Sequence, residues 1–307
     1  MNTVVVAGEI NVDLILTGID VLPVFGTEML ARGASQVPGS SSMICALGLA
    51  KLGDAVRFVG RMGEDERGRY CEAALREAGI DTCAVIVDAS HATGLTVSLS
   101  GATDRALVTY PGAIAELCGA DVSDSVLQGA THLHISSYFL QTKLQRDIAD
   151  LVARARTAGL TVSLDPGFDP SGAWDAGLRE VLRLVDVFLP NAVEACALTS
   201  TDDVEVALRQ LAALGPTVVI KHGSEGCLTL HGDAVLRVPT FAVDAVDTTG
   251  AGDSFNAGFL HAWLARKPLD ACLRWAAACG ALSTRALGGT PAQAHEGDVL
   301  ALLGDRP

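Results

Sequence analysis

The sequence predicts an α/β fold in which helices flank a central, mostly parallel β-sheet. Two observations lead to this prediction. Short apolar runs rich in β-branched residues alternate along the chain with longer amphipathic stretches of helical period, and this alternation is typical of βαβ units. The apolar runs also contain few polar residues. We therefore expect strands that are covered on both faces, as in a parallel sheet.

Six runs are the candidate strands of this sheet. They are VVVAG at 4–8, VRFVG at 56–60, THLHIS at 131–136, LTVSLD at 160–165, VDVFLP at 185–190 and TVVIKHG at 217–223. The clearest helical patterns are RGRYCEAALREAGI at 67–80, KLQRDIADLVARARTAGL at 143–160 and DVEVALRQLAALG at 203–215. Each helical pattern has a glycine at its end, where a left-handed residue commonly terminates an α-helix.

Two segments break the βαβ rhythm. Residues 12–37 and 93–112 contain strand patterns that are separated by turn residues. We expect them to pair into one small antiparallel sheet that lies over the main domain as a lid. The alternative is two surface hairpins without a gating role. The main α/β domain would consist of residues 1–11, 38–92 and 113–307.

Composition limits the classes of protein to which the chain could belong. A chain of 307 residues with 49% hydrophobic residues and 32 glycines suits a compact α/β domain with an excursion. The formal net charge of -14 disfavours nucleic acid and anionic membranes as partners. The N-terminus has neither a basic start nor a long apolar run, and the eight cysteines include no CxxC pair. We therefore expect a reduced, cytoplasmic protein.

The segment VDTTGAGDSFNAGFLHAWL, at 246–264, carries the most informative chemical pattern. Gly250 and Gly252 permit a tight turn in which backbone N–H groups converge, and a helical pattern follows directly. A glycine turn that leads into a helix N-terminus is a binding site for anions. Asp253, in the first helical turn, could accept a proton from a hydroxyl beside a bound phosphate. The alternative is an ordinary capping aspartate.

Two strand patterns place a pair of polar residues two positions apart, and therefore on one face. Asn11 and Asp13 emerge from the first strand, where they could bind neighbouring hydroxyls of a small molecule. The alternative is an exposed pair at a strand end. His132 and His134 form the second pair, but no third metal ligand is near them in the sequence. We interpret them as hydrogen-bonded histidines rather than as a metal site.

Two further segments follow predicted strands. Asn191 and Glu194 open a helix and share one of its faces. They could hold magnesium through waters and phosphate oxygens, or they could only cap the helix. The turn KHGSEG could contact the phosphates or the ribose of a nucleotide, although such turns are also routine in hairpins. Its candidate binding residues are Lys221, Gly223, Ser224 and Gly226.

These segments resemble the ribokinase-like, or phosphofructokinase B type, family of carbohydrate kinases. The segment around Asp253 is similar to the C-terminal signature of that family, and VGRMGEDERGRYCEAALREAGID at 59–81 is similar to its N-terminal signature. In the latter segment, Gly63, Asp65 and Gly68 stand at matching positions. The resemblance covers nearly the whole chain. It implies a ribokinase-like fold with a small β lid, and ATP-dependent phosphorylation of a sugar hydroxyl.

The resemblance also implies roles for single residues. Asp253 would take the proton of the acceptor hydroxyl, and Asp13 would bind the sugar. The amides of Gly250, Ala251 and Gly252 would hold the transferring phosphate. ATP and magnesium are thus the implied ligands of the main domain, in which we place nucleotide binding and catalysis.

Further ligands and partners follow from the same resemblance. Asn191 and Glu194 match an Asn-x-x-Glu motif that the family carries near magnesium and the nucleotide, which favours the metal role over simple capping. Asp247 and Thr249 resemble positions that bind an activating monovalent cation such as potassium. In many relatives the edges of the lid pair into a homodimer, and the lid edges of this chain could pair in the same way, but the sequence leaves the oligomeric state open.

The chain departs from the family pattern in three places. Gly39 is retained in a Gly-Gly turn, but Ser40 replaces the second glycine, and Ile44 replaces an asparagine that usually points at the acceptor. Ala277 stands where relatives often have an asparagine near the adenine. These changes alter the expected pattern of acceptor and nucleotide contacts. They leave the choice among fructose, ribose and related sugars open.

Two other functions compete with a sugar kinase. A nucleoside kinase is the first, because relatives of this fold also phosphorylate the ribose of nucleosides. The second is a catalytically silent protein that binds sugars or nucleotides, although such a protein would not need Asp253, Asn191 and Glu194 together. An acidic ketosugar as acceptor would require a basic group near the pocket, and Arg105 is the candidate.

Overall fold

The computed structural model describes residues 2–101 and 105–304. Residues 102–104, within the predicted lid segment, lie outside the described residues. The strands of the central sheet are β1 (Thr3–Ala7), β4 (Ala55–Gly63), β5 (Asp81–Asp88), β8 (His132–Ile135), β9 (Thr161–Leu164), β10 (Val187–Phe188), β11 (Thr217–Lys221), β12 (Cys227–His231) and β13 (Ala234–Val238). They are ordered β13-β12-β11-β10-β9-β8-β1-β4-β5. Every neighbouring pair from β11 to β5 is parallel, whereas β12 and β13 are antiparallel additions at one edge.

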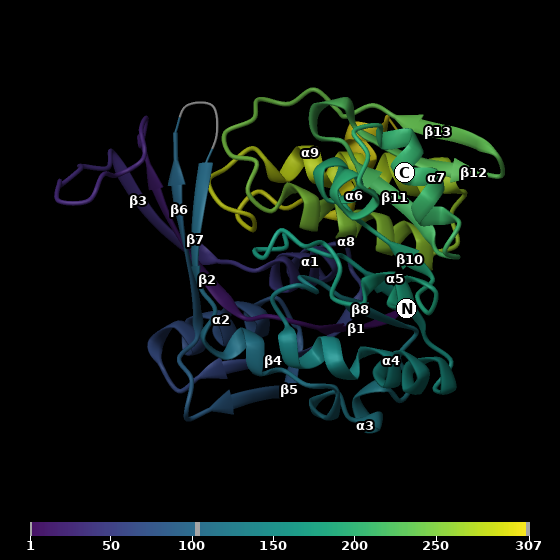
Figure 1. Ribbon diagram of the computed structural model, residues 1–307, viewed down its shortest axis with the longest axis horizontal. Helices are drawn as coiled ribbons and strands as arrows, with labels where there is room; N and C mark the ends of the chain where they lie inside the picture. Colours follow the sequence, from purple (N-terminus) through teal and green to yellow (C-terminus); the bar gives the residue numbers. More distant parts are fainter. Residues whose placement is uncertain (1, 102–104, 305–307) are drawn as a thin grey trace.

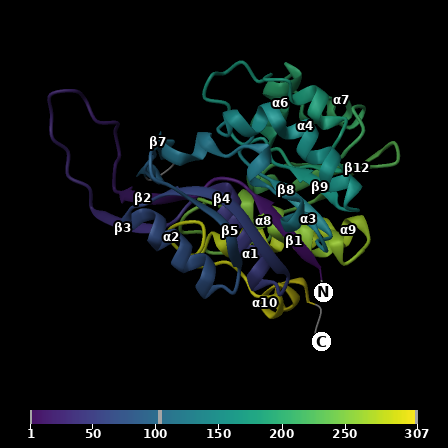
Figure 2. The same ribbon diagram turned by 90° about the horizontal axis from the view of Figure 1, so that it is seen from below.

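Helices cover both faces of this sheet (Figure 2). One face carries α1 (Ser41–Lys51), α2 (Glu66–Glu77), α8 (Ala251–Leu264), α9 (Leu269–Ser283) and α10 (Glu296–Leu303). The other carries α3 (Asp124–Leu127), α4 (Thr142–Thr157), α5 (Leu178–Leu182), α6 (Ala192–Thr199) and α7 (Val204–Ala212). Short 3-10 turns are η1 (Gly112–Glu116), η2 (Gly119–Asp121) and η3 (Gly223–Glu225). Val4 and Val6 pack into one hydrophobic cluster, whereas Val5 and Ala7 pack into the other, because successive side chains of a strand point to opposite faces.

The predicted α/β fold with a mostly parallel sheet is confirmed, and all six predicted strands lie in it. The three predicted helices correspond to α2, α4 and α7. Gly79 and Gly159, which follow α2 and α4, have φ angles of 76° and 87°, as the left-handed end of a helix requires. Among the described residues, no helix combines the length and the apolar character that crossing a bilayer requires.

A second, four-stranded sheet projects from one side of the molecule (Figure 1). Its strands are β2 (Asn11–Thr17), β3 (Gly33–Pro38), β6 (Gly94–Ser100) and β7 (Arg105–Tyr110), in the order β3-β2-β6-β7. The expectation of a purely antiparallel sheet is wrong, because the central pair β2 and β6 is parallel. The two strands continue β1 and β5, which run in the same direction within the main sheet. They therefore leave that sheet in the same direction, although β4 lies between β1 and β5 in the main sheet.

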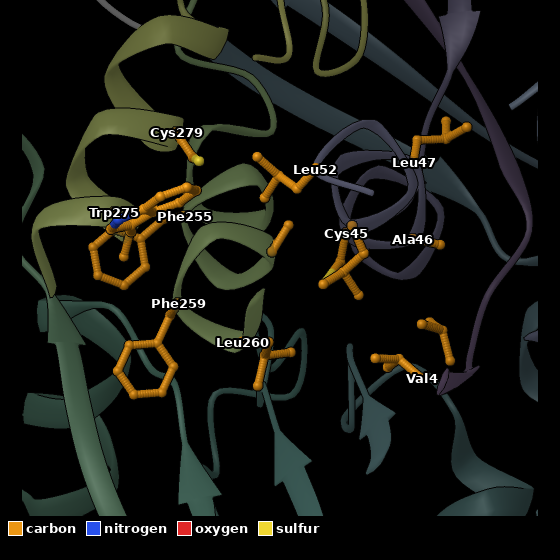
Figure 3. Packing of buried hydrophobic residues seen from close by; sticks show 14 of the residues in the cluster. Val4, Cys45, Ala46, Leu47, Leu52, Phe255, Phe259, Leu260, Trp275 and Cys279 are labelled. Carbon is orange, nitrogen blue, oxygen red and sulfur yellow. The ribbon is translucent and has the colours of Figure 1, made fainter. Parts of the chain in front are cut away.

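Helix α8 is held between α1 and α9 in the larger hydrophobic cluster (Figure 3). Phe255 and Phe259 on α8 belong to this cluster together with Trp275 and Cys279 on α9. Gly258 allows the two helices to approach closely, since a Cβ at this position would lie 2.7 Å from Sγ of Cys279. Dense packing of this kind leaves a helix little freedom to shift. The N-terminus of α8 is therefore held firmly in place.

Candidate active site

The carboxyl ends of the parallel strands bring several predicted site residues to one edge of the sheet. Asp165 follows β9, Asn191 follows β10 and Lys221 ends β11. These strands are neighbours in the sheet, and Asn191 forms a parallel bridge with Lys221. Helix α8 adds Gly252 and Asp253, and a Cβ at Gly252 would lie 3.6 Å from Nζ of Lys221. Ligands of open α/β sheets bind at this kind of edge.

The predicted glycine turn leads directly into α8. Gly250 has a φ of 70° and precedes the first helical residue, Ala251. A Cβ at Gly250 would also lie 2.6 Å from the Cα of Gly289, so both the backbone conformation and the lack of space require glycine. The N–H of Ala251 donates to the carbonyl of Thr248 at 3.3 Å. The next amides of the first turn have no acceptor within the helix, so they are the ones that suit an anion.

Asp253 lies in the first turn of α8, among other charged groups. Burial raises its pKa from 3.8 to about 7, and the negative charges of Asp165 and Glu9 act in the same direction. The ammonium of Lys221 and a hydrogen bond from Ser41 act in the opposite direction. A carboxylate whose pKa is close to neutrality is well suited to accept a proton as a general base.

A hydrogen-bonded cluster beside Asp253 was missed in the sequence. Nζ of Lys221 lies 2.6 Å from Oδ2 of Asp165 and 3.3 Å from Oδ1 of Asn256, and Nδ2 of Asn256 donates to the same Asp165 oxygen at 2.6 Å. The side chain of Lys221 therefore points toward Asp165. Two signals in the sequence could have indicated the cluster. Asp165 directly follows a buried strand, and Asn256 comes three residues after Asp253, which places both side chains on one face of the helix.

Asn11 and Asp13, which were predicted to bind the sugar that accepts the phosphate, lie together on β2, against Gly39. A Cβ at Gly39 would overlap Oδ1 of Asp13 and would lie 2.8 Å from Oδ1 of Asn11. Nδ2 of Asn11 donates to Oγ1 of Thr96 at 2.8 Å. Oδ1 of Asn11 is buried and lacks a hydrogen-bond partner within the described residues. Because a buried, unpaired carbonyl oxygen is costly, this atom is a candidate for binding a ligand hydroxyl.

The small sheet and the loop before α8 face the same space. Burial and repulsion by Asp253 raise the pKa of Asp13 to about 7, whereas the guanidinium of Arg105 lowers it. Arg105 also donates from Nη1 to Oγ1 of Thr248 at 2.8 Å. Thr248 belongs to the loop that leads to α8, so this hydrogen bond joins β7 to the main domain. Asp13, Asp253 and Arg105 therefore surround one region.

The N-terminus of α1 forms another side of this region. Ser40 has a φ of 66° and a ψ of 142°, and its hydroxyl accepts the N–H of Met43 at 3.0 Å while donating to the carbonyl of Glu9 at 2.7 Å. The buried carboxylate of Glu9 in turn accepts hydrogen bonds from the N–H of Ser41 and from the hydroxyl of Ser137. Glu9, which sequence reasoning passed over, therefore anchors the turn that contains Ser40.

The other two departures from the family pattern are buried. Ile44 is 2% exposed, and a Cβ at Gly250 would lie 3.0 Å from its Cδ1. It therefore packs against the glycine turn that precedes α8. Ala277, on α9, is 4% exposed and belongs to the same hydrophobic cluster as Phe255. Their influence on the acceptor and on the adenine stays a prediction.

Asn191 and Glu194 form a capping box at the start of α6. Oδ1 of Asn191 accepts the N–H of Glu194 at 2.9 Å, and Oε2 of Glu194 accepts the N–H of Asn191 at 2.8 Å. Burial, together with repulsion by nearby carboxylates, raises the pKa of Glu194 to about 7. Residues 2–101 and 105–304 hold no group of three or more His, Cys, Asp or Glu that could bind a metal by itself. Hard oxygen donors fit magnesium that is shared with phosphates.

The remaining predicted residues shape two turns. Oδ1 of Asp247 accepts the N–H of Thr249 at 2.9 Å, and Oδ2 of Asp247 accepts the N–H of Gly288 at 2.8 Å. These bonds organise the loop before α8, and a role in cation binding stays a prediction. The KHGSEG turn joins the antiparallel strands β11 and β12, so its interpretation as a hairpin turn is confirmed. The candidate nucleotide contacts in this turn are Gly223, Ser224 and Gly226.

His132 and His134 belong to a row of hydrogen bonds within the sheet. The row runs from Oγ1 of Thr161 to Nδ1 of His132, then from Nε2 of His132 through Oγ of Ser163 to Nδ1 of His134, and from Nε2 of His134 to Oγ of Ser136. The four contacts measure 2.7–2.8 Å. Burial lowers the pKa of the two imidazoles to about 3 and about 4. The interpretation as hydrogen-bonded histidines is confirmed.

Comparison with known protein families matches residues 1–295 to the pfkB family carbohydrate kinases. The chain belongs to this family. It is 32% identical to the ATP-dependent ribose-1-phosphate kinase of Halopiger xanaduensis over 100% of this chain and 99% of the relative. It is 30% identical to fructokinase-1 of Oryza sativa subsp. japonica over 93% of this chain and 94% of the relative.

Solved structures agree with this assignment to the pfkB family. The ribokinase of Arabidopsis thaliana, solved with ribose and ATP, superposes with a TM-score of 0.82 at 27% identity and covers 98% of both chains. A putative ribokinase II from E. coli, solved with ATP and Mg²⁺, has a TM-score of 0.88 at 23% identity over both full chains, which supports the fold. The predictions of the family, the ribokinase-like fold and a carbohydrate kinase are confirmed.

Proposed function

We propose that this pfkB-family kinase transfers the γ-phosphoryl group of ATP to a hydroxyl of a small sugar, with Asp253 as the general base. The position of Asp253 is the observation that carries the proposal. Its carboxylate, with a pKa of about 7, stands in the first turn of α8, directly after a glycine turn whose geometry suits an anion. A base and an anion site side by side are the two parts that phosphoryl transfer to a hydroxyl needs from a protein.

The proposed mechanism assigns one task to each part of the site. Asn11 and Asp13 orient the acceptor, and Asp253 takes the proton of the attacking hydroxyl. The amide of Gly252 stabilises charge on the phosphoryl oxygens. Magnesium bound with the phosphates would neutralise part of their charge, and Glu194 is the residue that fits it best. The Halopiger relative is named as ATP-dependent, and the E. coli structure holds ATP and Mg²⁺, which supports these ligands.

Ribose and fructose are the first acceptors to consider. The relatives include ribokinases and fructokinases that match more than 90% of this chain. Both sugars present neighbouring hydroxyls that could donate to the unpaired Oδ1 of Asn11 and to the carboxylate of Asp13. A phosphorylated sugar is a second candidate. Arg105 favours it, because this cation lies near Asp13, and the Halopiger relative is named a ribose-1-phosphate kinase.

The role of Asp253 is tested with Asp253→Asn. The amide has nearly the same shape but cannot take a proton, so we expect kcat to fall by about 100-fold or more while the affinity for ATP changes little. The measurements are ADP production with ribose, fructose and ribose 1-phosphate, and calorimetric titration with ATP. The control is Asp233→Asn, an exposed aspartate in the turn between β12 and β13. A variant with wild-type kcat would rule out the assigned base.

The class of acceptor is tested with Arg105→Gln. If the acceptor is phosphorylated, loss of the guanidinium should lower kcat/KM for ribose 1-phosphate by about 10-fold or more, because a charged hydrogen bond is lost. For ribose and fructose we expect a change of less than about threefold. A screen of these three compounds and adenosine measures both effects. Turnover of adenosine alone would instead indicate a nucleoside kinase.

A further inference from the structure

We propose that Lys221 is a catalytic residue that binds the transferring phosphoryl group, and that Asp165 and Asn256 hold its ammonium in place for this task. The inference rests on the proposed kinase function and adds a residue to its machinery. It sharpens the expectation that Lys221 belongs to a nucleotide-binding turn, because it names the group that Lys221 binds and the residues that position its ammonium. The case rests on the geometry around Nζ, on the charge of the site and on the cost of burying an ion pair.

The ammonium is fixed from three separate elements. Lys221 ends β11, Asp165 follows β9, and Asn256 lies on α8. Each of the three is hydrogen-bonded to the other two, at 2.6, 3.3 and 2.6 Å. The side chain of Lys221 is 12% exposed and that of Asp165 is 5% exposed. A long lysine side chain that is clamped in this way has one position rather than many.

One N–H of Lys221 remains for a ligand. An ammonium group has three donors, and within the described residues Asp165 and Asn256 are the two acceptors that it meets. A Cβ at Gly252 would lie 3.6 Å from Nζ, so the ammonium stands beside the amide-bearing turn at the start of α8. A phosphoryl group bound at that turn would therefore lie within reach of the third N–H.

The negative charge of the site explains why a positively charged residue is needed at position 221. Burial lowers the pKa of Lys221, but attraction by Asp165 and Glu194 raises it more, so the group stays protonated. Asp253 and Glu194 are acids in the same neighbourhood, and they would repel an incoming phosphate. A buried ion pair contributes little to stability compared with apolar residues of similar size. Its presence at this position is better explained by the phosphate that it would attract.

The step is a transfer of one phosphoryl group. The acceptor oxygen forms a bond to the γ-phosphorus of ATP, and the bond from that phosphorus to the oxygen bridging the β- and γ-phosphates breaks. The electron pair of the broken bond leaves with ADP, and the hydroxyl proton goes to the carboxylate of Asp253. Lys221 gives up no proton, since it contributes a positive charge and an N–H to an equatorial oxygen of the moving group.

The test separates a catalytic role from a structural one. Lys221→Met alone leaves the buried carboxylate of Asp165 unpaired, and it should lower the melting temperature. The double variant Asp165→Asn/Lys221→Met removes both charges, and it should regain most of the lost melting temperature. We nevertheless expect its kcat to be about 100-fold below wild type, with KM for ATP within about threefold. The control, Lys267→Met, removes a lysine that follows the opposite end of α8, where it lies over the ring of Trp275.

A second measurement reports on the phosphoryl site without turnover. Wild-type protein with ADP, Mg²⁺ and acceptor should bind aluminium fluoride, which mimics the transferring group, and the double variant should bind it at least 10-fold more weakly by titration. If the double variant has a kcat within about fivefold of wild type and binds aluminium fluoride normally, the ion pair is only structural and the inference is overturned. A wild-type protein that phosphorylates no acceptor but binds aluminium fluoride with the help of Lys221 would contradict the proposed function alone.

Discussion

Ser40 combines a strained backbone conformation with hydrogen bonds that organise one side of the candidate active site. Its φ of 66° and ψ of 142° lie in a region that residues other than glycine rarely adopt. The hydroxyl offsets part of this strain, because it caps α1 through the N–H of Met43 and holds the carbonyl of Glu9. The strained conformation places the first amides of α1 beside Glu9 and near Asp253.

Substitutions at Ser40 should separate these two contributions. Ser40→Ala keeps the strain and loses the cap, whereas Ser40→Gly relieves the strain and keeps a favourable N-cap residue. We expect the glycine variant to be more stable than the alanine variant by about 2 kcal/mol, as measured by urea unfolding. Equal stability of the two variants would show that position 40 does not adopt a positive φ in solution.

Single residues differ in how far the sequence could predict them. Gly250, Gly252 and Asp253 were found because all three lie in one short segment, so their spacing alone describes a turn and a helix start. The contact between Asp165 and Lys221 joins residues that are 56 positions apart, and the contact between Asp165 and Asn256 joins residues 91 apart. Such contacts depend on strand order and on the placement of α8, which local patterns do not contain.

At the scale of elements, α6 shows how one motif can have two uses. The capping box of Asn191 and Glu194 satisfies the first N–H groups of this short helix. The same box holds both side chains at the carboxyl edge of the sheet, near Lys221. Capping and a role near magnesium are therefore compatible, and the two can be separated by substitution.

Asn191→Ser preserves an N-cap acceptor, whereas Asn191→Ala removes it. We expect the serine variant to unfold with a free energy within about 0.5 kcal/mol of wild type, and the alanine variant to lose about 1 kcal/mol. Both should raise the Mg²⁺ concentration that gives half-maximal activity by about 10-fold, because the amide that supports the ion is lost. An unchanged Mg²⁺ requirement in both variants would leave Asn191 with a capping role alone.

Six of the nine strands of the main sheet were predicted, but the pairing in the small sheet was not. Apolar strands and glycine-ended helices have local signals, and their alternation restricts the fold to few arrangements. The direction of β2 relative to β6 depends instead on the directions of β1 and β5 in the main sheet, which these two strands continue. Three strands of the main sheet, β5, β12 and β13, are not among the six predicted ones, although the alternation of Leu228, Thr229 and Leu230 in β12 is itself a strand pattern.

At the scale of the molecule, buried acids and buried histidines have opposite effects on stability. Asp253 has a pKa of about 7 when folded and an ordinary value of 3.8. Below about pH 4 the carboxyl group is protonated in both the folded and the unfolded protein, and its contribution to stability has its full value. That contribution is lost as the pH rises through 7, because the buried group must then ionise. His132 has a pKa of about 3 when folded and an ordinary value of 6.5. Its contribution is complete above 6.5 and is lost as the pH falls.

Asp253→Asn should remove the part of this pH dependence of stability that comes from the buried acid. Since the amide has no charge to bury, the variant should gain stability relative to wild type as the pH rises from 4 to 7, and the gain should then level off. A shift of one pKa unit corresponds to about 1.4 kcal/mol, and partial solvent contact reduces the effect, so we expect a gain of about 2 kcal/mol. Urea unfolding at pH 4.5, 6 and 7.5 measures it. A difference that does not vary with pH would contradict the raised pKa.

The row from Thr161 to Ser136 has a consequence for how this chain can evolve. Each imidazole is bonded on both sides. Replacing His134 with an apolar residue would leave the buried hydroxyl of Ser136 without its partner, whereas after replacement of His132 the hydroxyl of Ser163 keeps His134 and that of Thr161 keeps the carbonyl of Thr131. Replacing the whole row with apolar residues would leave no such orphan. We therefore expect His134 to persist in descendants of this sequence that keep Ser136, whereas loss of His132 alone leaves every remaining hydroxyl of the row with a partner.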